Sequence, residues 1–221
     1  MDAFAVGSDQ WIDCVVSGAA RMGIRLNAAA AQGLARHAAE TVLWNKKINL
    51  TAITDPVDFA VKHVLDSMQA APFIPRCARV MDVGSGGGFP GMVLKIVRPD
   101  LTMVLVDASR KKVSFLKHII RLLSLQHIEA RHARTEELER AGEWIAGFDV
   151  VISRAFSSLW EFYGKAGAFV KEGGMMIAYK GGCVREEIQH FLDRSSNGMD
   201  VKTYRFSHFG MERALVILQA V

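Results

Sequence analysis

The chain has 221 residues, of which 50% are hydrophobic and 23% are charged, enough apolar material for a sizeable core, so wholesale disorder is excluded. Its longest uninterrupted apolar runs are five residues, far short of the roughly 20 that a membrane-spanning helix needs. The formal net charge is +4, with residues 1–75 contributing a net −1 and residues 76–221 a net +5. The later part is therefore the better candidate to face an anionic partner.

Targeting and metal-binding signals are missing from the sequence. The first ten residues lack the basic-then-apolar pattern of a secretory signal, so we expect a cytoplasmic protein. The three cysteines, Cys14, Cys77 and Cys183, form no CxxC pair and no Cys/His cluster. This spacing argues against structural zinc and against a disulfide framework, and we predict no metal site.

The first third of the chain has helical periodicity. Apolar residues recur at helical spacing over 11–16 and again over 34–43, and Asn27 is placed to cap the second of these helices. Asp55 and Pro56 have the pattern of a cap and first position for a third helix. We therefore predict a helical N-terminal extension over residues 1–75.

After residue 75, short β-rich stretches alternate with helical ones. The seven predicted strands are Ala78–Val83, Leu101–Val106, 127–131, 148–153, 174–180, 199–207 and 213–220. Alternation of this kind implies a mostly parallel sheet covered on both faces, and the last two stretches indicate a closing antiparallel hairpin. We predict a doubly wound, Rossmann-like α/β domain over residues 76–221 that forms one structural unit with the extension.

A glycine-rich loop follows the first of these strands. It has glycines at positions 84, 86, 87, 88 and 91, and a helix follows directly. Glycine adopts positive φ readily and allows a ligand to approach the backbone, and the helix start offers unpaired N–H groups. In a doubly wound sheet this loop lies at the carboxyl edge, where ligands bind.

Two common nucleotide motifs fit this loop unequally. A Walker loop requires a lysine at the position of Met92, so an NTPase is excluded. Gly86, Gly88 and Gly91 satisfy the GxGxxG spacing of dinucleotide-binding proteins, so the loop alone leaves an NAD(P)-dependent oxidoreductase open.

Two acidic residues favour S-adenosylmethionine instead. Asp82 precedes the glycines, where a carboxylate suits the cationic methionine end of this cofactor and would repel a pyrophosphate. Asp107 ends the next strand, where an acid can accept both ribose hydroxyls of an adenosine. The alternative is a tight strand-to-helix turn with Asp107 as a helix cap.

Several blocks in order carry a resemblance to a known family. They are Asn49-Leu-Thr-Ala-Ile53, His63-Val-Leu-Asp-Ser67, Ser85-Gly-Gly-Gly-Phe-Pro-Gly91, Lys111-Lys112 with Phe115-Leu116, Ser153-Arg-Ala-Phe156, and Lys180-Gly181. Together they span about residues 44–181, and the chain closely resembles the bacterial small-subunit rRNA guanine-N7 methyltransferases, the RsmG (GidB) family.

This resemblance implies a class I S-adenosylmethionine-dependent methyltransferase fold. It implies methylation of N7 of one 16S rRNA guanine, with 16S rRNA in the small ribosomal subunit or its precursor as partner. By analogy, Gly84 and Phe89 border the cofactor, the backbone of Thr135 and Glu136 lies by its adenine, and Arg154 lies at the active-site edge. We also assign Gly86 and Gly88 of the same loop to the cofactor. We expect a monomer without a membrane partner.

Further residues are candidates for contact with RNA. His63 and Asp66 share one helix face, which either docks the extension onto the sheet or borders the active-site mouth, and Asn49 and Thr51 carry the same ambiguity. The candidates for phosphate contact are the cations Arg110, Lys111, Lys112, Lys180, Arg205 and Arg213.

The chemistry at N7 needs no general base, because this nitrogen has a free lone pair. We therefore expect Arg154 to position the guanine or a nearby phosphate, with catalysis coming from proximity. Three alternatives remain open from the sequence: a methyltransferase acting on another RNA, a protein or a small molecule; the oxidoreductase above; and a non-enzymatic ribosome-binding factor.

Overall fold

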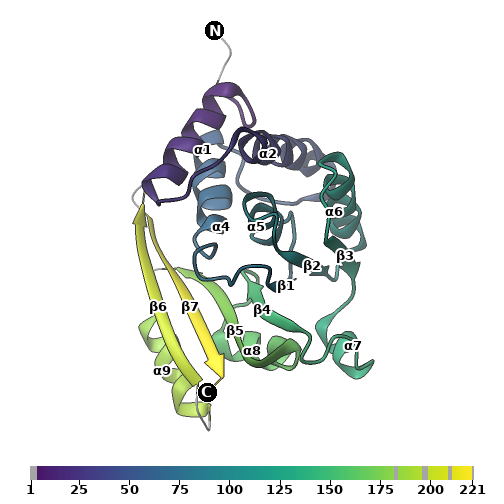
Figure 1. The fold of residues 1–221 in the computed structure, drawn as a ribbon, viewed down its shortest axis with the longest axis vertical. Helices are drawn as coiled ribbons and strands as arrows, with labels where there is room; N and C mark the ends of the chain where they lie inside the picture. The colour runs from purple at the N-terminus through teal and green to yellow at the C-terminus, as the bar shows by residue number, and fades with distance from the viewer. Residues whose placement is uncertain (1–3, 182–183, 196–198, 209–210, 221) are drawn as a thin grey trace.

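A seven-stranded sheet forms the centre of the computed structural model, which describes residues 4–181, 184–195, 199–208 and 211–220. The strands are β1 (Arg79–Val83), β2 (Thr102–Asp107), β3 (Ile128–His132), β4 (Phe148–Ser153), β5 (Val170–Gly181), β6 (Met199–His208) and β7 (Met211–Ala220). Their order is β3-β2-β1-β4-β5-β7-β6, in which β1 to β5 are parallel and β7 pairs antiparallel with both β5 and β6. This is the predicted doubly wound sheet with its closing hairpin (Figure 1).

Helices cover both faces of the sheet. Those on one side are α1 (Asp9–Arg21), α2 (Ala28–Ile48), α3 (Pro56–Phe59), the π-helix η1 (Ala60–Leu65), α4 (Asp66–Met68), α5 (Gly91–Val97) and α6 (Arg110–Leu122). Those on the other side are α7 (Thr135–Arg140), α8 (Leu159–Ala166), the short 3-10 helix η2 (Gly167–Phe169) and α9 (Arg185–Arg194). Alternate strand residues face the two buried clusters, because side chains of a strand point to opposite faces. Figure 1 shows the two helical layers.

The N-terminal helices pack directly onto the sheet. Trp11 of α1 and Leu34 of α2 are fully buried in the same cluster as Val80 of β1 and Leu105 of β2. The α2 helix begins where the sequence predicts, because the Asn27 side chain accepts the N–H of Ala30. The extension therefore covers one face of the sheet where the first two strands lie.

The predicted third helix differs from expectation in its interior. Asp55 caps it and Pro56 opens it as predicted, but residues 60–65 wind as a π-helix before the α-helical winding resumes. Apolar periodicity cannot distinguish the two windings over so short a stretch. Inserts of π-helix are frequent at functional sites, and this one carries His63.

Two predicted features lie outside the described residues, namely Cys183 and the side chain of Arg205. Within the described part of the chain, none of the helices is long and apolar enough to cross a membrane.

Candidate active site

The glycine loop is compact because its glycines take conformations that other residues avoid. Gly84, Gly86 and Gly88 have φ values of +75°, +56° and +88°. A Cβ on Gly84 would lie 2.6 Å from the Cβ of Ala155, in the loop after β4, and one on Gly88 would lie 2.7 Å from the Cβ of Met92. The backbone is packed too closely for a side chain at these two positions, whereas a Cβ on Gly86 would meet nothing closer than 3.9 Å.

Asp82 stabilises this loop through a hydrogen bond from the protein interior. It is fully buried, and its Oδ2 accepts the N–H of Gly91 at 2.9 Å. Its Oδ1 is buried without a hydrogen-bond partner among the described residues. Burial raises the pKa of Asp82 to about 7. An orphaned carboxylate oxygen of this kind fits a cationic group, in agreement with its predicted place at the methionine end of the cofactor.

Asp107 holds the loop from the next strand. Its Oδ2 accepts the N–H of Gly86 at 2.9 Å, and its Oδ1 accepts the N–H of Ser109 at 2.8 Å. The helix cap is Ser109, whose side chain accepts the N–H of Lys112, so Asp107 is not itself the cap. Each carboxylate oxygen retains a free lone pair, which leaves the predicted acceptance of ribose hydroxyls chemically possible.

A cleft of about 160 Å³ opens beside this loop at the carboxyl edge of the sheet. Gly84, Asp107, Thr135, Glu136 and Phe156 contribute to its lining. Thr135 is the first residue of α7, and Arg134 is the N-cap, so the turn before α7 brings Thr135 and Glu136 to the cleft. Five residues from four segments, namely the glycine loop, the end of β2, the start of α7 and the loop after β4, thus converge at one opening.

Arg154 follows β4 and is fixed by three hydrogen bonds. Its Nη1 donates to the carbonyl of Lys62 at 2.9 Å and to Oδ2 of Asp66 at 3.1 Å, and its Nη2 donates to Nδ1 of His63 at 3.1 Å. The guanidinium carbon lies 5.7 Å from the ring centre of Phe89. Arginine has five N–H groups, so two remain without an acceptor among the described residues.

Asp66 links this arginine to the closing hairpin. It is buried, and its Oδ1 lies 3.4 Å from Nε of Arg213 on β7. Burial raises the pKa of Asp66, while the charges of Arg154 and Arg213 oppose that rise. Three residues predicted separately from the sequence therefore form one charge cluster around the buried Asp66.

A second cavity, of about 520 Å³, lies beside Arg154. Four cationic side chains contribute to its lining, and they come from η1, the loop after β4, β5 and β7: Lys62, Arg154, Lys180 and Arg213. Phe156 lines both this cavity and the smaller cleft. The two openings therefore adjoin at Phe156, next to Arg154.

Lys180 is placed at this cavity but is already well bonded. Its Nζ donates to the carbonyls of Phe156 and Ser157, both at 3.1 Å, and lies 2.8 Å from Oε1 of Glu187. An ammonium group has three N–H donors, and three acceptors are present. This arrangement ties the loop after β4 to β5 and α9.

Two histidines that contact the glycine loop come from the N-terminal extension. His63 stacks on Phe89 with ring centres 4.5 Å apart, and burial followed by the charge of Arg154 lowers its pKa to about 3. His37 of α2 stacks on the same ring at 4.8 Å and donates from Nε2 to the carbonyl of Gly87 at 2.8 Å. Sequence reasoning misses His37, because nothing in the alanine-rich pattern of α2 shows which face meets the loop.

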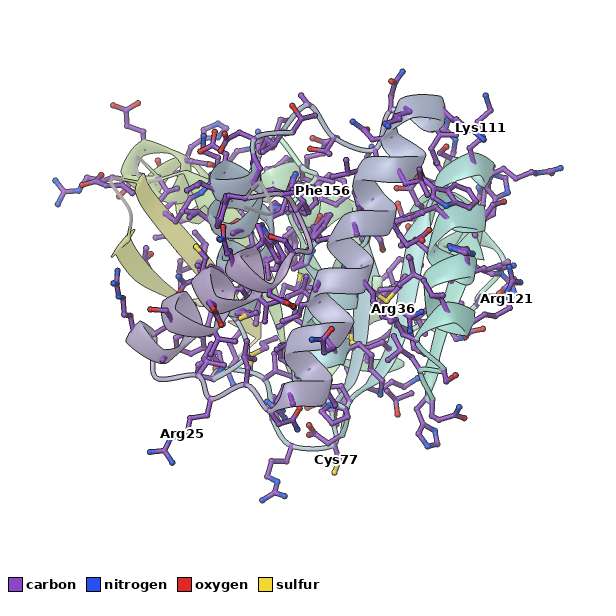
Figure 2. The ribbon with its side chains drawn as sticks, turned by 90° about the horizontal axis from the view of Figure 1, so that it is seen from above. Arg25, Arg36, Cys77, Lys111, Arg121 and Phe156 are labelled. Carbon is purple, nitrogen blue, oxygen red and sulfur yellow. The ribbon has the colours of Figure 1, made fainter. Side chains whose placement is uncertain are left out.

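The remaining predicted residues lie on the surface. Asn49 is exposed at the end of α2, where its left-handed conformation terminates the helix. Arg110 and Lys111 are exposed in the first turn of α6, and Lys112 is half-buried there. Figure 2 shows Lys111 and Phe156 at one end of the molecule, with Arg25 and Cys77 at the opposite end.

Comparison with known proteins identifies the family. Residues 30–216 match the sequence model of GidB, described as rRNA small subunit methyltransferase G. The Ribosomal RNA small subunit methyltransferase G of Geobacter sp. (strain M21) is 42% identical over 205 residues, which cover 91% of this chain and 94% of that protein. This chain belongs to the rRNA small subunit methyltransferase G family.

Solved structures agree in fold with this assignment. A SAM dependent methyltransferase from Aquifex aeolicus superposes with a TM-score of 0.57 at 17% identity, covering 76% of this chain and 94% of that one. M. jannaschii TYW2, solved in complex with AdoMet, gives a TM-score of 0.55 at 14% identity, covering 72% and 76%. The predicted family, class I methyltransferase fold, enzyme class and S-adenosylmethionine cofactor are confirmed, and the family membership decides against the oxidoreductase.

Proposed function

We propose that this chain transfers a methyl group from S-adenosylmethionine to N7 of a guanine in 16S rRNA, presented by the small ribosomal subunit or its precursor. The observation that carries the proposal is the junction of two cavities at Phe156 and Arg154. One cavity adjoins the glycine loop, and the other is lined by four cations. A family of rRNA methyltransferases needs such a pair, one opening for the cofactor and one for an anionic polymer.

The cofactor is assigned to the smaller cleft and the glycine loop. Asp82, Gly84, Gly86, Gly88 and Phe89 supply the loop, and the cleft is completed by Asp107, Thr135 and Glu136, with Arg154 at its edge. When bound, S-adenosylmethionine supplies an electrophilic methyl group on a sulfonium sulfur. The cleft is smaller than the roughly 300 Å³ of a typical ligand pocket, so it accounts for one portion of the cofactor only.

The protein's own contribution to the chemistry is positioning. N7 of guanine attacks through its lone pair without losing a proton, so no general base is required. The titratable groups nearest Arg154 are engaged, since Asp66 is paired with two arginines and His63 is hydrogen-bonded at both ring nitrogens. Arg154 retains two N–H donors and borders the cavity, which suits contact with guanine O6 or a nearby phosphate.

The start of α6 is proposed to contact the RNA backbone. Arg110, Lys111 and Lys112 occupy the first turn of this helix, where the positive end of the helix dipole disfavours cations. No acidic residue lies in that turn, and none of the three has an ion pair within the described part of the chain. These three cations at the positive end of the helix dipole are stabilised when phosphates bind there. We assign Asn49 and Arg213 to the same RNA-facing edge.

The protein is proposed to act as a monomer in the cytoplasm, where small ribosomal subunits are found. Residues 1–75 and 76–221 are proposed to form one structural unit, because the extension supplies Trp11, Leu34 and His37 to contacts with the sheet or the glycine loop. Without the extension, the active site would lack His37 and His63, which stack on Phe89.

The identity of the methyl acceptor is tested with labelled S-adenosylmethionine and material from a strain that lacks this enzyme. Three acceptors are compared: small subunits, naked 16S rRNA and total soluble protein. We expect transfer to the subunit or its precursor, and binding that weakens steeply with salt. Transfer to protein, or binding of subunits that is unaffected by salt, would contradict the proposal. Subunit binding with no binding of S-adenosylmethionine would favour a non-enzymatic ribosome-binding factor.

A further inference from the structure

The imidazole ring of His63 is held from three sides. Its Nε2 lies 2.6 Å from Oγ1 of Thr51, its Nδ1 lies 3.1 Å from Nη2 of Arg154, and its ring stacks on Phe89 with 17° between the planes. These partners come from the loop after α2, the loop after β4 and the glycine loop. His63 is thus the point at which these three segments meet beside the larger cavity.

The partners determine where the ring hydrogen lies. A guanidinium group only donates, so Nδ1 of His63 must accept the hydrogen bond from Arg154. The hydrogen of the neutral ring is then on Nε2, which donates to Oγ1 of Thr51. Thr51 Oγ1 also accepts the N–H of Ile53 at 2.9 Å, which holds the hydroxyl in place as an acceptor. A protonated ring would set one N–H against another at Arg154.

We propose that His63, as the neutral tautomer with hydrogen on Nε2, is a positioning residue that orients the guanidinium group of Arg154 against Phe89, and that Thr51 holds the ring in place by accepting from Nε2. The inference rests on the proposed function, in which Arg154 faces the guanine. It gives His63 a role through Arg154, in place of the direct contact with RNA or the docking of the extension that the sequence left open.

The anchoring of Arg154 explains why such a residue is needed. Its other two anchors, the carbonyl of Lys62 and Oδ2 of Asp66, both bind Nη1. Among the described residues, His63 alone accepts from Nη2. Arginine commonly binds guanine at O6 and N7 together, which would cover the lone pair that must attack. By engaging one Nη2 hydrogen, His63 reduces the donors that face the cavity and leaves Arg154 able to bind O6 without covering N7.

Two substitutions of His63 test the role of its acceptor atom Nδ1 separately from the role of its aromatic ring. In His63→Asn, the side-chain oxygen lies near the position of Nδ1, whereas His63→Gln reaches toward Nε2 and lacks an acceptor beside Arg154. Both lose the stack on Phe89, so they differ in which polar contact is kept: Asn keeps an acceptor beside Arg154, and Gln keeps a partner for Thr51. We expect His63→Gln to lower kcat/KM for small subunits by roughly 10- to 100-fold and His63→Asn by clearly less. Equal losses in the two variants would overturn the proposal.

A double-mutant cycle tests whether His63 acts through Arg154. We expect His63→Gln to cause no further loss of kcat/KM in the Arg154→Met background, because the group that it positions is already absent. Additive losses would overturn the proposal. Equilibrium binding of S-adenosylmethionine and the melting temperature are measured for each variant, so that a general loss of folding is recognised.

The tautomer itself is read by ¹⁵N NMR of histidine side chains at pH 7, without cofactor or RNA. We expect a pyrrole-type Nε2 and a pyridine-type Nδ1 for His63, assigned by comparison with His63→Asn. Thr51→Ser and Thr51→Val should both preserve this pattern, because Arg154 still donates to Nδ1 in each variant. A hydrogen on Nδ1 in the native protein or in Thr51→Val would contradict the inference. Because no RNA is present, a failure of methyl transfer to rRNA would contradict the proposed function and would leave the tautomer result standing.

Discussion

The two cavities at the carboxyl edge of the sheet are formed by different parts of the chain, one mainly by backbone and the other mainly by side chains. The proposed cofactor side is formed by main chain, with glycines at positive φ and two carboxylates, Asp82 and Asp107, that bind backbone N–H groups. The proposed substrate side is formed by side chains, with four cations and a histidine drawn from η1, β5, β7 and the loop after β4. The first side depends on backbone shape, and the second depends on charge and on buried hydrogen bonds.

This difference separates the expected consequences of mutation. A side chain at Gly84 or Gly88, where no room exists for a Cβ, should prevent binding of the cofactor and should leave binding of RNA intact. Removal of a charge or an acceptor should disable the substrate side and leave binding of the cofactor intact. Variants of the two sides test that separation, here in order of decreasing effect.

Gly84→Val should abolish binding of S-adenosylmethionine. Its φ of +75° disfavours any side chain, and a Cβ there would lie 2.6 Å from that of Ala155. Gly23→Val is the matched control, because Gly23 also has a φ of +75° but a Cβ at that position would have nothing within 4 Å. Calorimetric titration of both variants with the cofactor measures the effect. Normal cofactor binding by Gly84→Val would contradict the assignment of the loop.

Arg154→Met should lower kcat/KM for small subunits by about 100- to 1000-fold, the usual cost of a lost transition-state donor. Binding of S-adenosylmethionine should change little, because the hydrogen bonds of Arg154 go to the extension rather than to the cleft. Arg79→Met, at the start of β1 on the opposite edge, serves as control. A loss confined to cofactor affinity would show that the two sides are not separate.

Lowering the pH should stabilise the folded protein through protonation of Asp82. Burial raises its pKa to about 7 from an ordinary 3.8, so the native protein holds a proton that the unfolded chain releases between those values. The free energy of unfolding attributable to Asp82 should therefore fall as pH rises through this window, by up to about 1.4 kcal/mol per pH unit. Urea denaturation of the wild type and Asp82→Asn at pH 5, 6 and 7 isolates this contribution. Parallel pH dependences in the two proteins would contradict it.

Lys111→Gln should weaken binding of small subunits modestly and lower the slope of log affinity against log salt by about 1. Arg25→Gln is the matched control, since Arg25 is an exposed cation at the opposite end of the molecule (Figure 2). Titrations of both variants at several salt concentrations measure the slopes. Equal slopes for the two variants would place the RNA elsewhere.

The comparison of the two sides also explains what the sequence can predict. Asp82 and the glycine loop are contiguous in the chain and Asp107 ends the next strand, so spacing alone selects the glycines, Asp82 and Asp107. Most helices and strands lie within a few residues of their predicted positions, because alternation and capping are local signals. The main exception is β5, which begins at Val170 rather than near 174.

The substrate side is predictable only as separate residues. The ion pairs that join Asp66 to Arg154 and to Arg213 connect positions 88 and 147 residues apart, which no spacing rule brings together. Lys180 is a predicted phosphate contact, yet three protein acceptors surround its ammonium group, so that role stays a prediction. His37 and Thr51 contribute through contacts that exist only after the extension has packed on the sheet.

The central claim is tested most directly by mapping the modified atom. Small subunits from a strain lacking this enzyme are incubated with tritiated S-adenosylmethionine and the purified chain, and the labelled nucleotide is then identified by digestion and mass spectrometry. The account predicts one labelled 16S rRNA guanine carrying the methyl group at N7. Label on another guanine atom, on another base, or on no rRNA guanine would contradict it.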